Sequence, residues 1–124
     1  RVLIGEDNPE IIDGLLLFMS SISENLELDA ARSGLEALER IKDKRPDLII
    51  LDVVMPGMDG FEVLDRLRRA PATQAIPVLV LTGYSDAAEK AKAQGAQDVL
   101  LKPFERQKFI DKILQLLRQK QETA

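Results

Sequence analysis

Short apolar runs alternate with longer amphipathic stretches along the whole chain, and this pair of features recurs five times. The apolar runs are rich in Val, Ile and Leu, which is typical of strands buried on both faces of a parallel sheet. The stretches between them carry apolar residues at helical spacing. The pattern predicts an α/β domain with a doubly wound five-stranded parallel sheet and helices on both of its faces.

The strands are expected at residues 2–4, 26–30, 48–52, 77–82 and 99–101, and the helices at about 9–22, 33–44, 59–69, 85–95 and 104–120. Capping residues support three of the helix starts. Asn8 can cap a helix whose first turn contains a proline. Ser33 and Glu36 form a capping box, and Asp59 and Glu62 have the same spacing and the same roles.

The helices differ in how much they are expected to bury. In the first helix we predict a core stripe formed by Ile11, Leu15, Phe18, Met19 and Ile22. Leu16 and Leu17 lie off this stripe, beside an acidic loop, where they could dock a partner helix. The fourth helix is rich in alanine, so it should be held loosely and suits a switching surface. The last helix has an apolar stripe over residues 109–117 that is wide enough for contact with a neighbouring domain or a second copy.

Composition excludes several functional classes. The 124 residues suggest one domain, and without cysteine or histidine the chain has no thiol or histidine chemistry and no such metal ligands. The absence of cysteine fits a cytoplasmic location. A net charge of −4 without a basic stripe argues against direct nucleic-acid binding, and no apolar run could span a membrane. Because the chain begins with Arg1 and enters a strand at once, we interpret it as a domain excised from a longer chain, with 121–124 as a tail or the start of a removed linker.

Polar side chains are expected to gather where the strands end. Asp52 closes the third strand, and Pro56, Gly57 and Gly60 then break the chain into a loop. In an open α/β sheet the carboxyl ends of the strands share one edge, where ligands bind. The same edge should receive the side chains that follow the other strands, which are Glu6, Asp7, Thr82 and Lys102.

This set of residues predicts a phosphoryl site. Three carboxylates in one crevice repel one another, and a hard divalent cation such as Mg²⁺ relieves that repulsion. Lys102 adds a fixed cation and Thr82 a hydroxyl donor, so a phosphoryl group on one carboxylate would be neutralised there. Taken singly, each residue has an ordinary interpretation as a helix cap, a solvated loop residue or part of a turn. Their combination at equivalent strand exits is far more specific.

The chain resembles a bacterial two-component response-regulator receiver domain over essentially its whole length. The resemblance is carried by Val2-Leu3-Ile4-Gly5-Glu6-Asp7-Asn8, by Leu51-Asp52-Val53-Val54-Met55-Pro56-Gly57-Met58-Asp59-Gly60-Phe61-Glu62, by Leu81-Thr82-Gly83, and by residues 95–104, which end in Leu101-Lys102-Pro103-Phe104. It implies a flavodoxin-like (βα)5 fold with sheet order 2-1-3-4-5 and a receiver domain over residues 1–120.

The resemblance also implies roles for the pocket residues. Asp52 would be the phosphoacceptor. Asp7, Asp52 and the backbone carbonyl of Val54 would ligate Mg²⁺, with Mn²⁺ as an alternative, and Glu6 would act through water. Lys102 would pair with the phosphoryl oxygens.

The remaining roles concern the switch and the access to Asp52. Thr82 would move to bond the phosphoryl group, while Gly83 leaves the attacked carboxylate uncovered. The peptide bond before Pro103 is expected to be cis. Tyr84, at the rim, could shield the acyl phosphate from water.

Two positions depart from the family pattern. The first acid is Glu6 where the family most often has Asp, which should shift the water network around the metal. Val99 stands where the family usually has Tyr or Phe, and its side chain is too short to turn inward as theirs does. We therefore hypothesise that the usual coupling between Thr82 and position 99 is weak or rerouted.

The implied function is a phosphorylatable signalling switch that changes the face around its fourth and fifth helices, not a turnover enzyme. Its partners would be a sensor histidine kinase or phosphotransfer protein, and its own effector domain or a second copy. The main alternative is a non-phosphorylated pseudo-receiver that acts as an interaction module. A small phosphatase should have a general acid where Val54 stands, and a flavodoxin-like cofactor protein should not have Glu6 and Asp7 in its first loop.

Overall fold

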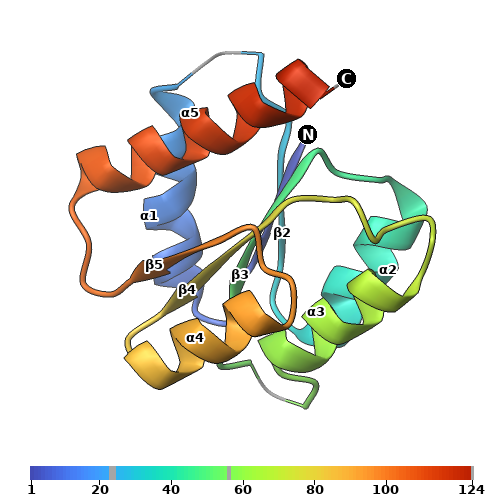
Figure 1. Cartoon of the computed structure of the whole chain (residues 1–124). Coiled ribbons are helices and arrows are strands. Elements are labelled where there is room, and N and C mark those ends of the chain that lie inside the picture. Colours follow the sequence, from blue (N-terminus) through green and yellow to red (C-terminus); the bar gives the residue numbers. More distant parts are fainter. Residues whose placement is uncertain (23–24, 56, 124) are drawn as a thin grey trace.

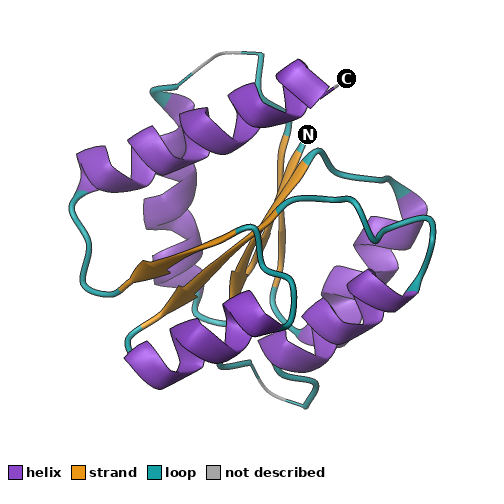
Figure 2. Cartoon of the chain, in the orientation of Figure 1, coloured by secondary structure: helices purple, strands orange, loops and turns teal. Residues whose placement is uncertain are grey.

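Five parallel strands form one sheet in the order β2-β1-β3-β4-β5 (Figures 1 and 2). The computed structural model describes residues 1–22, 25–55 and 57–123, and only the backbone of 119–123. The strands are β1 (Val2–Gly5), β2 (Leu28–Ala31), β3 (Leu48–Asp52), β4 (Val78–Thr82) and β5 (Asp98–Leu101). The predicted fold class and strand order are confirmed. Pro56, expected to break the chain after β3, lies outside the described residues.

Helices cover both faces of the sheet. They are α1 (Pro9–Ser20), α2 (Gly34–Asp43), α3 (Gly60–Arg69), α4 (Ser85–Ala93) and α5 (Arg106–Thr123). Figure 1 shows α1 and α5 on one face and α2, α3 and α4 on the other. Because successive residues of a strand point to opposite faces, Ile49 joins the core beneath α2 and α3 while Ile50 joins the core beneath α1 and α5.

The helices begin where local capping predicts. The side-chain oxygens of Asn8, Ser33 and Asp59 accept hydrogen bonds from the first-turn amides of α1, α2 and α3, at 2.9–3.1 Å. In α2 the capping box differs in one detail, because the Glu36 carboxylate accepts from the amide of Arg32 and not from that of Ser33.

The last helix differs from its expected bounds at both ends. It begins at Arg106 and not at Phe104, whose ring instead packs against that of Phe109 with 5.6 Å between the centroids. It continues to Thr123, through most of the segment expected to be a tail. Ala124, the end of that segment, lies outside the described residues.

The predicted core face of α1 was wrong in two places. Ile12, Leu15 and Met19 are buried, whereas Ile11 is 37% exposed and borders the site described below. Leu16 is partly buried against the core beneath α1 and α5, and Leu17 alone of the two leucines is largely exposed. The buried residues still follow helical spacing, but that spacing did not decide which of two adjacent isoleucines faces the sheet.

The sequence also predicted the burial of α4 and α5. In α4 only Ala91 is buried, as its alanine content predicts. In α5 the buried residues are Phe109, Ile113 and Leu116, and Leu114 is exposed. Within the described part of the chain, no helix is long and apolar enough to cross a membrane.

Candidate functional site

The strands β1, β3, β4 and β5 end around one cavity of about 500 Å³, at the edge where the sheet order reverses between β1 and β3. The cavity is lined by Glu6, Asp7, Asn8, Ile11, Asp52, Val53, Val54, Thr82, Gly83, Tyr84 and Lys102. The structure therefore brings together all the sequence-predicted site residues except Val99 and Pro103. We call this cavity the acceptor pocket.

Asp52 is the last residue of β3 and is only 5% exposed. Its Oδ1 accepts a hydrogen bond from the amide of Val54 at 2.8 Å, and its Oδ2 accepts from Nζ of Lys102. Burial opposes ionisation, but the neighbouring Glu6 and Lys102 outweigh it and hold the pKa of Asp52 below its usual value. The surroundings of Asp52 therefore favour its ionised form.

Glu6 follows β1 and is 3% exposed. Its Oε1 accepts from the amide of Asn8 at 3.2 Å, whereas the buried Oε2 accepts no hydrogen bond among the described residues and lies 3.9 Å from Nζ of Lys102. Burial, and then the neighbouring Asp52, raise the pKa of Glu6 to about 8. The two buried carboxyl groups are thus shifted in opposite directions, Asp52 toward the ionised form and Glu6 toward the protonated form.

Thr82 is also buried, and its hydroxyl Oγ1 accepts a hydrogen bond from the amide of Tyr84 at 3.2 Å. The backbone carbonyl of Thr82 accepts from the amide of Lys102 at 2.8 Å, which joins the ends of β4 and β5. Gly83 leaves open space where a side chain would stand, and Tyr84 is 70% exposed at the rim.

Two predicted residues lie elsewhere. Val99 packs against the core beneath α2, α3 and α4. Pro103 is exposed, and the peptide bond that joins it to Lys102 is cis, as the resemblance implied.

Arg32, in the loop after β2, contacts the backbone of a pocket residue, and sequence reasoning missed this contact. Its guanidinium Nε and Nη2 lie 3.4 Å from the backbone carbonyl oxygen of Asp7. The two residues are far apart in sequence, and no local pattern connects them.

The chemistry of the donors fits a hard cation, although the carboxylates do not converge on one point. No group of three or more Asp or Glu residues is arranged as a metal site within the described ranges. Asp52 instead pairs with Lys102. The donors are nonetheless all oxygens, and Oε2 of Glu6 is buried without a bond to accept, which is the kind of site that suits Mg²⁺.

Known proteins share both the sequence and the fold. Residues 2–114 match the family model described as the response regulator receiver domain. The transcriptional activator protein IrlR of Burkholderia pseudomallei is 37% identical over 123 residues, which are 98% of this chain and 52% of that protein. The chain spans about half the length of the curated relatives it matches.

Solved structures agree with that match. The signal receiver domain of a DNA-binding response regulator from Colwellia psychrerythraea is 31% identical, with a TM-score of 0.87 over 94% of this chain and 97% of that one. The signal receiver domain of a signal transduction histidine kinase from Syntrophus aciditrophicus is 32% identical, with a TM-score of 0.86 over 94% and 89% of the two chains. The chain therefore belongs to the family of response regulator receiver domains.

Proposed function

We propose that this domain is a phosphorylatable switch in which Asp52 accepts a phosphoryl group from a phosphohistidine of a partner protein. The observation that carries the proposal is the buried Asp52–Lys102 pair at the carboxyl edge of the sheet, with Thr82 and Glu6 lining the same cavity. An ionised carboxylate beside a lysine and a hydroxyl can both attack phosphorus and hold the product.

In the transfer step an oxygen of Asp52 attacks the phosphorus. The new O–P bond forms as the P–N bond breaks, and the electron pair leaves with the imidazole nitrogen. Lys102, which pairs with Oδ2 before the reaction, neutralises the phosphoryl oxygens after it. Thr82 turns its hydroxyl toward the same oxygens, and the amide of Tyr84 loses its present acceptor.

A divalent ion completes this site. Asp7, Asp52 and the carbonyl of Val54 would hold Mg²⁺, or Mn²⁺ as an alternative, with Glu6 acting through water. When bound, the ion supplies positive charge that offsets the developing charge on the phosphoryl oxygens. Glu6 must lose its proton to take part, and a nearby dication favours that loss.

The proposed partners follow from the family and from the surface around the pocket. The donor is a sensor histidine kinase or a phosphotransfer protein in the cytoplasm. The output passes through an effector domain of the same protein or a second copy of the chain, not through direct contact of this acidic domain with nucleic acid. The face around α4 and α5 is the one expected to change, since α4 begins directly after Tyr84 of the pocket rim and buries only Ala91.

The other interpretations have less support. A pseudo-receiver has no need of an acceptor, a lysine and a hydroxyl in one cavity, and all three are present. A turnover phosphatase would need a general acid where the exposed Val54 stands. The domain is therefore proposed to modify itself once and to lose the phosphoryl group slowly.

The experiment that tests the proposal is intact mass after incubation with acetyl phosphate, with and without Mg²⁺. Wild-type protein should gain one phosphoryl group only when Mg²⁺ is present, and Asp52→Asn should gain none. Asp13→Asn is the matched control, because it changes an exposed carboxylate of α1 in the same way. An unmodified wild type, or an adduct that persists in Asp52→Asn, would overturn the proposal.

A further inference from the structure

Besides packing on the core through the buried Ala91, the helix α4 is attached to the rest of the domain at its two ends. At its start, Tyr84 provides no side-chain cap, and the amide of Tyr84 donates to Oγ1 of Thr82 in the acceptor pocket. At its end, Nε of Arg68 in α3 donates to the carbonyl oxygen of Gly95 at 2.8 Å. The first attachment thus depends on the residue proposed to move on phosphorylation, and the second does not.

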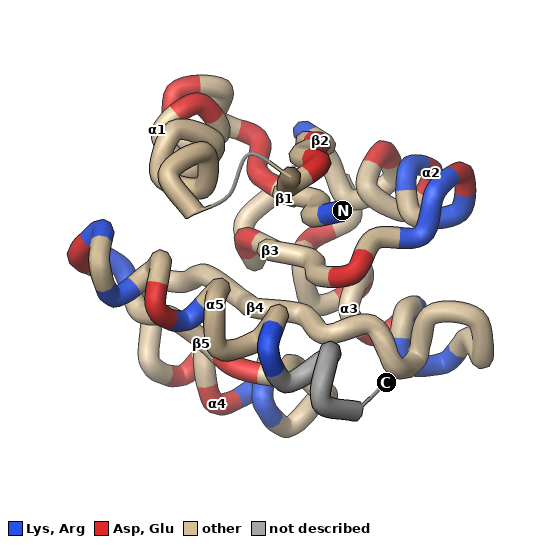
Figure 3. The backbone as a smooth tube through the Cα atoms, turned by 90° about the horizontal axis from the view of Figure 1, so that it is seen from above, with Lys and Arg blue, Asp and Glu red and all other residues tan. Residues whose placement is uncertain are grey.

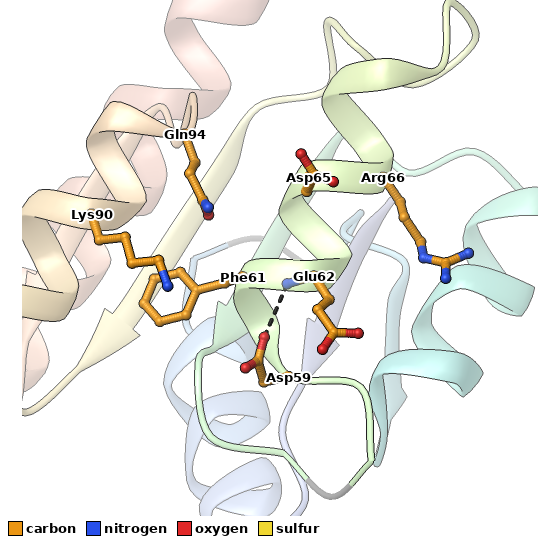
Figure 4. Close-up of a pocket in the computed structure, with 7 residues that line it drawn as sticks. All are labelled: Asp59, Phe61, Glu62, Asp65, Arg66, Lys90 and Gln94. Atoms are coloured by element: carbon orange, nitrogen blue, oxygen red, sulfur yellow. Dashed lines mark hydrogen bonds between the residues drawn. The ribbon is translucent and has the colours of Figure 1, made fainter.

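A third attachment lies between these two, in the groove of about 540 Å³ between α3 and α4 (Figure 4). Lys90 of α4 reaches across this groove and places its Nζ 4.2 Å from the centroid of the Phe61 ring in α3. An ammonium group at this distance is attracted by the face of the ring. Gln94 extends into the same groove, where its buried Oε1 accepts no hydrogen bond among the described residues.

Phe61 is tied directly to the backbone that follows Asp52. Its neighbour Gly60 donates its amide to the carbonyl oxygen of Val53 at 3.0 Å. A Cβ added to Gly60 would lie 2.7 Å from Cα of Val53, so the two backbones touch and leave no space for a side chain. A displacement of residues 52–53 is therefore passed to the first turn of α3, which carries Phe61.

A second possible route from the pocket to this face of the domain runs through β5, but no long side chain at position 99 connects the two. Val99 has a short side chain that packs against the core beneath α2, α3 and α4, and it does not line the acceptor pocket. Phe61 and Lys90, in contrast, form a contact between α3 and α4 that can be made or broken as a unit.

We propose that the Phe61–Lys90 contact is a latch that couples the acceptor pocket to α4. The latch holds α4 against α3 while Asp52 is unmodified. It opens when phosphorylation displaces Val53 and Gly60 and Thr82 releases the amide of Tyr84. This inference rests on the proposed function, and it names the contact through which that function reaches α4.

Lys90→Met tests the latch, because methionine keeps a long side chain and a similar helix propensity but removes the cation. Lys92→Met is the matched control, since Lys92 is an exposed lysine in the last turn of the same helix. The measurement is hydrogen exchange of the α4 amides before and after treatment with acetyl phosphate and Mg²⁺, with the phosphoryl adduct followed by intact mass in parallel.

We expect Lys90→Met to raise exchange in α4 about two- to fivefold before phosphorylation, as loss of a partly exposed cation–π contact implies. Phosphorylation should then raise it further by a smaller factor than in wild type. Lys92→Met should behave as wild type, and all three proteins should form the same adduct. Equal exchange in Lys90→Met and wild type, with the adduct formed, would overturn the latch alone. Absence of the adduct in all three proteins would overturn the proposed function.

Discussion

Two groups of charged side chains lie at opposite ends of β1, and they are neutralised to different degrees. Where β2 packs beside β1 and under α2, Arg1, Arg40 and Lys44 pair with acids, an arrangement that we call the β2 ion network. Figure 3 shows that basic and acidic positions lie close together around β2 and α2. Asp29 accepts from Arg1 at 2.8 Å and from Arg40 at 2.9 Å, and Lys44 pairs with Glu27 at 2.6 Å. Each of these carboxylates has a cation within hydrogen-bonding distance.

The acceptor pocket lacks that balance. Lys102 is the cation that faces both Glu6 and Asp52, and it pairs closely with Asp52 only. The pKa values follow the geometry. In the β2 ion network the pKa of Asp29 lies below its usual value, because hydrogen bonds from Ala30 and Arg40 outweigh the effect of burial, whereas in the pocket the pKa of Glu6 rises to about 8.

The difference separates a structural group of charges from a functional one. Carboxylates that already have cationic partners have little to gain from a ligand. Buried carboxyl groups that share one lysine gain from any added positive charge, and the cavity beside them admits it. We therefore expect substitutions in the two groups to act in different directions and at different pH.

The largest effect is expected from Lys102→Met. Removal of this cation leaves Asp52 buried without a charge partner, which should lower the free energy of unfolding by about 3 kcal/mol. The measurement is urea unfolding at pH 7 without metal. Lys44→Met is the matched control in the β2 ion network, and because Lys44 and Glu27 are both exposed its cost should be much smaller. Equal losses in the two variants would contradict the comparison.

The next largest effect concerns Glu6, which should make the free energy of unfolding fall as the pH rises. Its pKa of about 8 in the folded protein exceeds the usual value of 4.5, so between these values the folded state binds more protons than the unfolded state. The metal-free protein should therefore be most stable near pH 5 and lose a few kcal/mol by pH 8. Glu6→Gln cannot titrate and should lack most of this loss in urea unfolding. A wild-type stability that does not change from pH 5 to pH 8 would show that the pKa of Glu6 is not raised in the folded protein.

Asp29 should show the opposite dependence. Its pKa in the folded protein is lowered, so its contribution is present above the unfolded value of roughly 3.9 and is lost as the pH falls through the folded value. Asp29→Asn should cost about 1–2 kcal/mol at pH 7, because charged hydrogen bonds to Arg1 and Arg40 are weakened. Unfolding experiments in acid measure the pH-dependent contribution of Asp29, since the Asp29→Asn variant should lose less stability than wild type below pH 4. If the variant and the wild type lost the same stability below pH 4, the acid sensitivity would have to come from other carboxylates.

The smallest effect concerns the open side of the acceptor pocket. Tyr84 stands at the rim beside the uncovered Gly83, and its ring should slow the approach of water to an acyl phosphate. Tyr84→Ala should therefore shorten the phosphoryl lifetime a few-fold without preventing phosphorylation. The loss of adduct mass with time measures this lifetime, and an unchanged rate would remove the role of the ring.

The sequence predicted most of what depends on local pattern. Helix starts at Asn8, Ser33 and Asp59 were predictable because a cap and its amide lie within a few residues of each other. The grouping of Asp52 with Glu6 and Lys102 was also accessible, because parallel topology places successive strand ends at one edge. The order of the strands came from the resemblance to a known family.

What the sequence did not reveal depends on distance in the chain or on a choice between neighbours. Helical spacing could not decide between Ile11 and Ile12, since one lies four and the other three residues before Leu15, and both intervals place a residue on the same helical face as Leu15. Arg32 beside Asp7 and Lys90 over Phe61 join residues separated by 25 or more positions, and only the packed structure brings them together.

The most direct test of the central claim is to locate the phosphoryl group chemically. Borohydride reduces an acyl phosphate to an alcohol, so a phosphorylated aspartate is converted to homoserine, which peptide mass spectrometry can place. After treatment with acetyl phosphate and Mg²⁺, the account predicts homoserine at position 52 and at no other aspartate. Reduction at Asp7 or elsewhere, with position 52 unchanged, would contradict it.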